Sequence, residues 1–367
     1  MALDLSNLAH AGVRALRPYE PGKPIDELER ELGVSNIIKL ASNENPLGPS
    51  AQAIAALQDE LAELNLYPDG NAFNLKQALS RELNVEPAQL TIGNGSSDIL
   101  DFVLRAFVTP EHEVMFAEHA FAMYPILTRI IGAKPVQVKA RNWGHDLDAM
   151  AAAITDATRV VFIANPNNPT GTWLTKDELA AFLDRIPEDV LVVLDEAYFE
   201  YVDEADYPNG VNLVANYPNL VVTRTFSKVY GLAGLRVGYG VSTPQVADYL
   251  NRVRPPFNVN QLALVAAEHA LKDKEHLSKS VELNREGMKQ LVAAFEQLGI
   301  EYIPSVGNFI SAKMPRSGKA VFEALLREGV IVRPVDNYGM PDYLRITIGT
   351  EAENDKFITA LNKVLAA

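Results

Sequence analysis

Polar side chains of different kinds follow successive apolar runs in the middle of the chain. Asn168 lies in NPNNPTG after the run VVFIA, Asp195 follows VLVVL, and Lys228 follows LVVTRTFS. Ser227 directly precedes this lysine, and Arg236 follows it in the same glycine-rich stretch. Each residue alone is more typical of a turn or a helix cap than of a functional site. Because ligands collect beyond the carboxyl ends of parallel strands, we expect the whole set to converge on one crevice.

Pyridoxal 5'-phosphate is a cofactor whose chemistry requires this combination of groups. Its aldehyde binds a lysine amine, here Lys228, and its ring nitrogen needs a carboxylate, here Asp195, to hold a proton in place. Its phosphate needs hydroxyl and guanidinium donors, here Ser227 and Arg236, and the N-terminus of a helix. The residue types and their order therefore predict a site for this cofactor.

The elements that must position these groups alternate between strand-like and helical patterns. This alternation predicts an α/β fold with a mostly parallel sheet flanked by helices. From about residue 261 the pattern changes to a long helix, which is followed by the strand-like segments IVRPV and LRITIG. We therefore predict an N-terminal arm over residues 1–40 that belongs to a smaller domain, a large domain over 41–260, and a smaller α/β C-terminal domain over 261–367.

The composition limits the class of protein. With 367 residues, of which 48% are hydrophobic, the chain can bury a large core, and no apolar run is long enough to span a bilayer. A net charge of −14 argues against a nucleic-acid partner, while the lack of cysteine and the dispersed histidines argue against a metal site. The first residues lack the pattern of a signal peptide. We therefore expect a cytoplasmic protein with small-molecule ligands, no nucleic acid, no membrane and no metal.

Several motifs together resemble a known family. NPNNPTG, DEAYFEY, TFSKVYGLAGLRVGY and YLRITIGT, in this order, are similar to motifs of the aminotransferases that share the aspartate aminotransferase fold. With LASNENPLGP, LYPDG and GNGSSDIL upstream, the chain most closely resembles the histidinol-phosphate aminotransferase family. The resemblance implies a large domain that binds pyridoxal phosphate, a smaller C-terminal domain, and a homodimer with shared active sites.

The resemblance also implies roles for individual residues. Lys228 would form the Schiff base and move the proton during the reaction, and Asp195 would pair with the ring nitrogen. Asn168 and Tyr198 would bind the ring oxygen, which tunes the pKa of the Schiff base. Phe121, for which a core aromatic is the alternative, would stack on the ring. Further cofactor contacts are implied for the backbone amides of Ser96 and Ser97, for Ser227 and Arg236 at the phosphate, and for Tyr67 from a partner subunit.

The substrate side depends on two arginines within apolar strands, Arg333 and Arg345. A guanidinium there is costly unless it meets an anion, such as a carboxylate, a phosphate or the carboxylate of a structural salt bridge. By resemblance, Arg345 would receive the α-carboxylate of an amino acid or the phosphate of histidinol phosphate. Tyr19 and Asn45 would lie near the substrate, with a turn residue as the alternative for Asn45.

The implied reaction is a transamination in histidine biosynthesis. Imidazole-acetol phosphate and glutamate would exchange with histidinol phosphate and 2-oxoglutarate, so the partners are a small-molecule amino donor and a 2-oxo acid acceptor. An aromatic amino-acid aminotransferase or a dual-specificity enzyme is the main alternative, because apolar pockets separate such rings by only about 1 to 3 kcal/mol. A threonine-phosphate decarboxylase and a non-catalytic cofactor-binding regulator are weaker alternatives.

Overall fold

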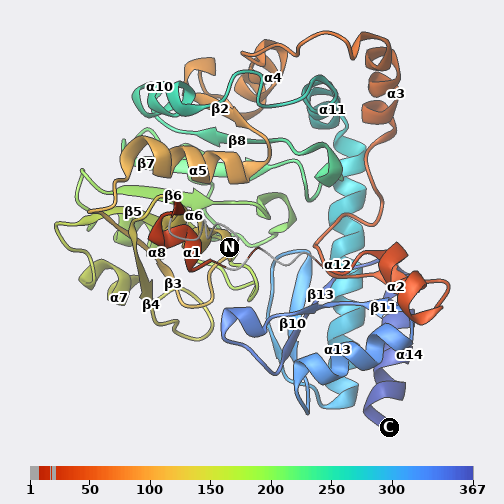
Figure 1. Cartoon of the computed structure of the whole chain (residues 1–367). Helices are drawn as coiled ribbons and strands as arrows, with labels where there is room; N and C mark the ends of the chain where they lie inside the picture. Colours follow the sequence, from red (N-terminus) through yellow and green to blue (C-terminus); the bar gives the residue numbers. More distant parts are fainter. Residues whose placement is uncertain (1–7, 17, 19–21, 367) are drawn as a thin grey trace, which may run out of the picture.

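A mostly parallel sheet forms the centre of the larger part of the molecule. The computed structural model describes residues 8–16, 18 and 22–366 (Figure 1). The strand order of this seven-stranded sheet is β2-β8-β7-β6-β5-β3-β4. Strand β8 runs antiparallel to β2 and β7, and the pairings from β7 to β4 are parallel. Its strands are β2 (Leu90–Gly93), β3 (Glu113–Ala117), β4 (Lys134–Val138), β5 (Thr158–Ala164), β6 (Leu191–Asp195), β7 (Leu220–Thr225) and β8 (Gly238–Val241).

Both faces of this sheet are covered, which explains why its strands read as apolar runs. Alternate residues of β5 enter different cores: Val161 and Ile163 belong to one, and Val160 and Phe162 to the other. The helices of this part are α3 (Ala51–Glu60), α4 (Phe73–Leu83), α5 (Ser96–Phe107), α6 (Met123–Ile130), α7 (Leu147–Ala152), α8 (Lys176–Leu183), α9 (Gly210–Leu213), α10 (Pro244–Val253) and α11 (Gln261–Lys272). The predicted α/β fold with a mostly parallel sheet is thus confirmed.

A smaller part is built on an antiparallel sheet with the strand order β12-β13-β10-β9. A short parallel pair, β1 (Ile38–Lys39) with β11 (Val330–Ile331), joins the N-terminal segment to it. The other elements here are α2 (Ile25–Leu32), β9 (Tyr302–Ile303), β10 (Phe309–Lys313), α13 (Gly318–Arg327), β12 (Arg333–Pro334), β13 (Tyr343–Thr347) and α14 (Glu351–Ala366). Leu28 of α2 packs against Leu326 and Ile331, so the arm and the C-terminal segment share a core.

The long helix α12 (Lys274–Leu298) connects the two parts (Figure 1). Its first half packs on the large-sheet core through Leu277 and Val281, whereas Leu291 and Phe295 belong to the core of the smaller sheet. Helix α11 packs on α3 and α4, beside the large sheet. We therefore propose that the division between the domains lies within α12, rather than near residue 261 as the sequence pattern suggests.

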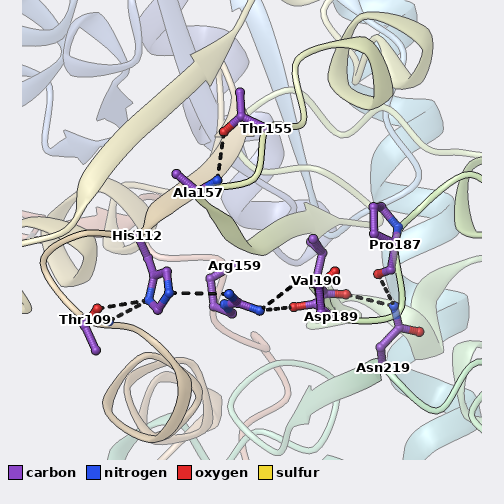
Figure 2. A network of polar contacts seen from close by, with 9 residues as sticks. All are labelled: Thr109, His112, Thr155, Ala157, Arg159, Pro187, Asp189, Val190 and Asn219. Atoms are coloured by element: carbon purple, nitrogen blue, oxygen red, sulfur yellow. Dashed lines mark hydrogen bonds and ion pairs between the residues drawn. The ribbon is translucent and has the colours of Figure 1, made fainter.

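The amino ends of the large-sheet strands are tied together by a polar network (Figure 2). The guanidinium of Arg159 donates to the backbone oxygen of Asp189 at 2.5 Å and lies 3.4 Å from the His112 ring. The amide of Asn219 donates to the carbonyls of Pro187 and Val190. Within the described ranges, no helix is both long and apolar enough to cross a membrane.

Candidate active site

A pocket lies at the opposite, carboxyl end of β5, β6 and β7, where the large sheet meets the smaller part. It is lined by residues of both parts, including Ala41 and Ser42 of the segment after β1. The sequence-predicted residues that line it are Ser96, Ser97, Phe121, Asn168, Asp195, Tyr198, Ser227, Lys228, Arg236, Arg333 and Arg345. The expected convergence of the strand ends on one crevice is therefore what the fold produces.

Lys228 lies in the wall of this pocket, directly after the β7 strand. Its Nζ donates to the carbonyl oxygen of Ser42 at 3.1 Å. Burial, together with the nearby positive charge of Arg345, lowers the pKa of Lys228 to about 7. Its amine is therefore substantially neutral near physiological pH, as a nucleophile or a proton acceptor must be.

Asp195 ends strand β6 and is held by two side chains. The hydroxyl of Tyr124 donates to Oδ2 and that of Thr223 donates to Oδ1, each at 2.9 Å. Burial raises the pKa of Asp195, and these two hydrogen bonds act in the opposite direction. Tyr124 stays protonated because burial and the Asp195 charge raise its own pKa. The two donors therefore favour a carboxylate at a buried position.

Tyr198 presents its hydroxyl to the pocket from the turn after β6. The hydroxyl oxygen accepts hydrogen bonds from the amides of Asn43 at 2.9 Å and Asn168 at 3.2 Å. Burial raises the pKa of Tyr198 to about 12, so the phenol remains protonated. Because both amides donate to it, the hydroxyl hydrogen is left to donate to a ligand oxygen.

The start of α5 forms an anion-binding corner with the loop after Lys228. Among the residues that the structure describes, no side chain caps this helix, so the amides of Ser96 and Ser97 are available to an anion. Arg236 donates to the Ser227 hydroxyl at 3.2 Å. A Cβ on Gly95, which has a φ of 84°, would lie 2.4 Å from the Arg236 guanidinium. Glycine at this position therefore allows the guanidinium to reach the helix start.

The substrate side of the pocket contains the two predicted arginines. Arg345 on β13 is buried and donates to Asn168 Oδ1 at 2.6 Å and to the Ala41 carbonyl at 2.7 Å. Its Nε is buried and has no hydrogen-bond partner among the described residues. Arg333 is half-buried on the neighbouring strand β12, directly opposite Arg345 in the register. The pair could bind a carboxylate or phosphate between the two sheets.

Two of the predicted residues, Tyr67 and Asn45, lie outside the lining of this pocket. Tyr67 is 82% exposed, stacks on Phe257 at 4.7 Å between ring centroids, and does not line this pocket. Asn45 is buried outside the pocket lining, and its amide donates to the Val229 carbonyl and to Ser280. These contacts tie Asn45 to the chain itself, and a role at the substrate stays a prediction. Tyr19 lies outside the described residues.

The sequence reasoning missed several residues of the pocket wall. Tyr124 lines the pocket three residues after Phe121. Thr223 does not line the pocket itself, but it is a polar residue within an apolar strand, pairs directly with Asp195 and donates to its carboxylate. Both patterns are visible in the sequence, but they gain meaning only once the strand register is known. Asn43 and Glu44 of the NENP motif also line the pocket, where Asn45 alone had been selected.

The residues present fit pyridoxal phosphate. The near-neutral Lys228 amine suits its aldehyde, the Asp195 carboxylate suits a protonated ring nitrogen, and the Tyr198 hydroxyl suits the ring oxygen. The uncapped start of α5 and the Arg236 guanidinium suit its phosphate. The fit depends on donors and acceptors around this pocket, such as the Tyr198 hydroxyl hydrogen and the amides at the start of α5, that have no partner among the described residues.

Comparisons with known proteins agree with this fit. The family described as aminotransferase class I and II matches residues 35–361. Histidinol-phosphate aminotransferase 2 of Pseudomonas fluorescens is 60% identical over 368 residues, which cover 100% of each chain. Histidinol-phosphate aminotransferase 1 of Nitrosococcus oceani is 59% identical over 358 residues, which cover 98% of this chain and 97% of the relative.

Solved structures give the same picture. Histidinol-phosphate aminotransferase from Sinorhizobium meliloti, in complex with pyridoxal-5'-phosphate, matches with a TM-score of 0.90 at 28% identity over 97% of each chain. A single mutant of Thermus thermophilus aspartate aminotransferase shares the fold, with a TM-score of 0.84 at 22% identity over 97% of this chain and 99% of that one. The chain thus belongs to the aminotransferase class I and II family, and over its whole length it is similar to histidinol-phosphate aminotransferases.

Proposed function

We propose that this protein is a pyridoxal-phosphate-dependent histidinol-phosphate aminotransferase of histidine biosynthesis. It would transfer the amino group of histidinol phosphate to 2-oxoglutarate, which gives imidazole-acetol phosphate and glutamate, and it would catalyse the reverse reaction as well. The observation that carries the proposal is the 60% identity, over the full length of both chains, to a relative of that name. The pocket, which joins a lysine of lowered pKa to two arginines, supports the same reaction class.

Bound pyridoxal phosphate would supply an aldehyde that captures amines and a ring that withdraws electrons from the adjacent carbon. Asp195 would keep a proton on the ring nitrogen, because Tyr124 and Thr223 hold its carboxylate in place. Tyr198 and Asn168 would bind the ring oxygen. Phe121 would pack against the ring, and the start of α5 would bind the phosphate with Ser227 and Arg236.

Lys228 would move the proton that the reaction requires. At neutral pH, its pKa of about 7 leaves a large share of the amines neutral, so Nζ can accept a proton from the substrate carbon next to nitrogen. The same atom, once protonated, can return that proton to a neighbouring carbon. The nearby Asp195 carboxylate and Arg345 guanidinium act on this pKa in opposite directions.

Arg345 and Arg333 would orient both substrates in turn. A guanidinium binds phosphate and carboxylate in similar bidentate geometry, so one arginine can serve histidinol phosphate and glutamate alternately. Arg345 already donates to Asn168, which places the substrate anion next to a residue that also contacts Tyr198. Substrate and cofactor would thus bind to one connected set of hydrogen bonds.

A homodimer with shared active sites is part of the proposal. Tyr67 does not line the pocket of its own chain and is 82% exposed, so it is accessible to the phosphate site of a partner subunit. A Lys228→Ala chain mixed with a Tyr67→Phe chain should recover part of the activity that each lacks. No recovery despite proven subunit exchange would contradict shared sites.

We also place the protein in the cytoplasm, because a phosphorylated substrate does not cross membranes freely.

The test of the proposed function follows the visible absorbance of the cofactor-loaded protein. Histidinol phosphate, phenylalanine and glutamate are added separately, and the loss of the absorbance is measured against concentration. Loss at far lower concentrations of histidinol phosphate than of phenylalanine is expected. Equal or better conversion of phenylalanine would move the protein to the aromatic aminotransferases, and no loss with any amine would contradict catalysis.

A further inference from the structure

Two carboxylates line the pocket within the described part of the chain, and they differ in how fully they are bonded. Asp195 accepts hydrogen bonds on both oxygens. Glu44 is 45% exposed along its side chain, and its one ion-pair partner among the described residues is Lys39, at 3.4 Å from Oε1. This is long for a hydrogen bond between charged groups. Glu44 therefore keeps capacity to accept a hydrogen bond from a ligand.

The position of Glu44 is set by the asparagines on either side. The backbone amide of Asn43 donates to the Thr347 hydroxyl at 2.9 Å, and its side chain binds Tyr198. Asn45 is tied to the Val229 carbonyl at 2.7 Å. A residue between two such anchors has little backbone freedom, so the main chain holds Glu44 in the wall of the pocket.

The charges around Glu44 suggest what it would bind. The other charged residues of the pocket wall, apart from Asp195, are cationic and suited to the anionic groups of cofactor and substrate: Lys228, Arg236, Arg333 and Arg345. The negative charge of Glu44 reaches the reactive end of the pocket, since it raises the pKa of Lys228 against the effect of burial. An acceptor here suits a ligand group that carries an N–H, and it is of no use to a plain hydrocarbon ring.

We propose that Glu44 is a specificity-determining residue that accepts a hydrogen bond from the imidazole N–H of the substrate. The inference rests on the proposed function, because it assumes a substrate that presents phosphate, amine and imidazole together. A site that hydrogen-bonds a ring N–H discriminates against an isostere that lacks it more strongly than an apolar pocket can. Because Glu44 is partly exposed, we expect a preference of about 10- to 100-fold rather than the larger values of buried sites.

Two unreactive probes test this proposal in the cofactor-loaded protein. Imidazolylpropyl phosphate and phenylpropyl phosphate lack the amine, so calorimetry measures their binding without turnover. Glu44→Ala should lower the affinity for the imidazole probe by about 10- to 100-fold and leave the affinity for the phenyl probe nearly unchanged. Glu44→Gln, which keeps a neutral acceptor, should lose less. Lys39→Met releases the Glu44 carboxylate, so it should raise the affinity for the imidazole probe and leave the affinity for the phenyl probe unchanged.

A matched control is Glu286→Gln on α12, which removes one negative charge outside this pocket. It should leave both probes unchanged. Equal weakening of both probes by Glu44→Ala, or an undiminished preference for imidazole, would overturn the role of Glu44. A wild-type protein that binds both probes equally would instead count against the proposed substrate, so the two failures are distinguishable.

Discussion

The two ends of the large sheet both carry polar networks, yet they use their hydrogen-bonding groups differently. At the amino end, Arg159 and Asn219 donate to backbone carbonyls of the neighbouring loops, so the network joins strand to strand (Figure 2). At the carboxyl end, Arg345 Nε lacks a partner among the described residues and the Tyr198 hydrogen is left to donate. The polar groups at the amino end are thus used to join parts of the fold, whereas those at the carboxyl end keep bonding capacity for a ligand.

Burial explains why this capacity has chemical consequences at one end only. Lys228 has its pKa lowered to about 7 within the pocket, and burial raises the pKa of Asp195. At the amino end the Asp189 side chain is 71% exposed, so water screens its ion pair with Arg159. Charges that lose water without gaining a full set of partners acquire altered proton affinities, and such groups are suited to catalysis.

The largest expected effect comes from removing Lys228, whose pKa is lowered to about 7 at the carboxyl end. Lys228→Ala should reduce the rate of amino transfer by at least about 10,000-fold, because nucleophile and proton carrier are lost together. Stopped-flow absorbance with histidinol phosphate measures this rate. The variant should also lose the visible band that borohydride bleaches in the wild type. A retained, reducible band would remove Lys228 from its proposed role.

The lowered pKa of Lys228 should also appear in the stability of the cofactor-free protein. Between about pH 7 and the usual value of 10.5, the unfolded chain binds a proton at this residue that the folded chain does not. The free energy of unfolding therefore rises with pH across this window. Below the window Lys228 is protonated in both states, and the folded protein carries the full cost of burying its charge. The stability advantage of Lys228→Met over wild type should shrink as pH rises through the window. Urea denaturation at several pH values measures it, and a constant advantage would contradict the lowered pKa.

A buried ion pair at the carboxyl end of β6 and β7 gives the next effect. Glu196 and Arg224 follow Asp195 and Thr223 in the chain, are almost fully buried, and lie 2.7 Å apart. Arg224→Met leaves the Glu196 charge buried and unpaired, so unfolding should become easier by about 3–5 kcal/mol in urea denaturation. Adding Glu196→Gln should restore part of this loss. If Arg224→Met lowered the free energy of unfolding no more than the loss of an exposed ion pair does, the expected difference between buried and exposed pairs would be contradicted.

A smaller effect is expected from the donors to Asp195. Tyr124→Phe removes one hydrogen bond to a charged group, so affinity for pyridoxal phosphate should fall by about 10- to 100-fold, as measured by fluorescence titration. Thr223→Val should act in the same direction. Tyr217→Phe, which removes a phenol hydroxyl that donates to the exposed Asp184, is the control and should change nothing. Unchanged affinity in Tyr124→Phe would mean that Thr223 alone suffices.

The smallest effect should come from the amino end. Arg159→Met breaks the contact with Asp189, yet it should change the free energy of unfolding by less than about 1 kcal/mol, because that pair is exposed to solvent. Amino transfer should be unaffected. Thermal denaturation and the half-reaction rate together check this, and a loss of activity would show that the two ends of the sheet are coupled.

Much of the site was predictable because its groups occur at the ends of recognisable strands. Asn168, Asp195 and Lys228 each follow an apolar run, and parallel pairing brings the ends of such runs together. Asn45 lies outside the pocket lining, and its sequence could not show this, because an asparagine in a turn and one at a ligand site look alike in sequence. Its neighbours Asn43 and Glu44 occupy the pocket wall instead, and only the direction of each side chain distinguishes the three.

The sequence by itself determined the fold class and the cofactor, and it predicted Lys228 as the residue that binds the cofactor, because strand pattern and residue type are local properties. Tertiary structure alone decided the rest. The pairing of Thr223 with Asp195, the approach of Arg236 to Gly95, and the meeting of Arg345 with Asn168 join residues from distant parts of the chain. The pKa of Lys228 belongs to this second group, because it depends on burial and on charges that come together only when the two sheets pack.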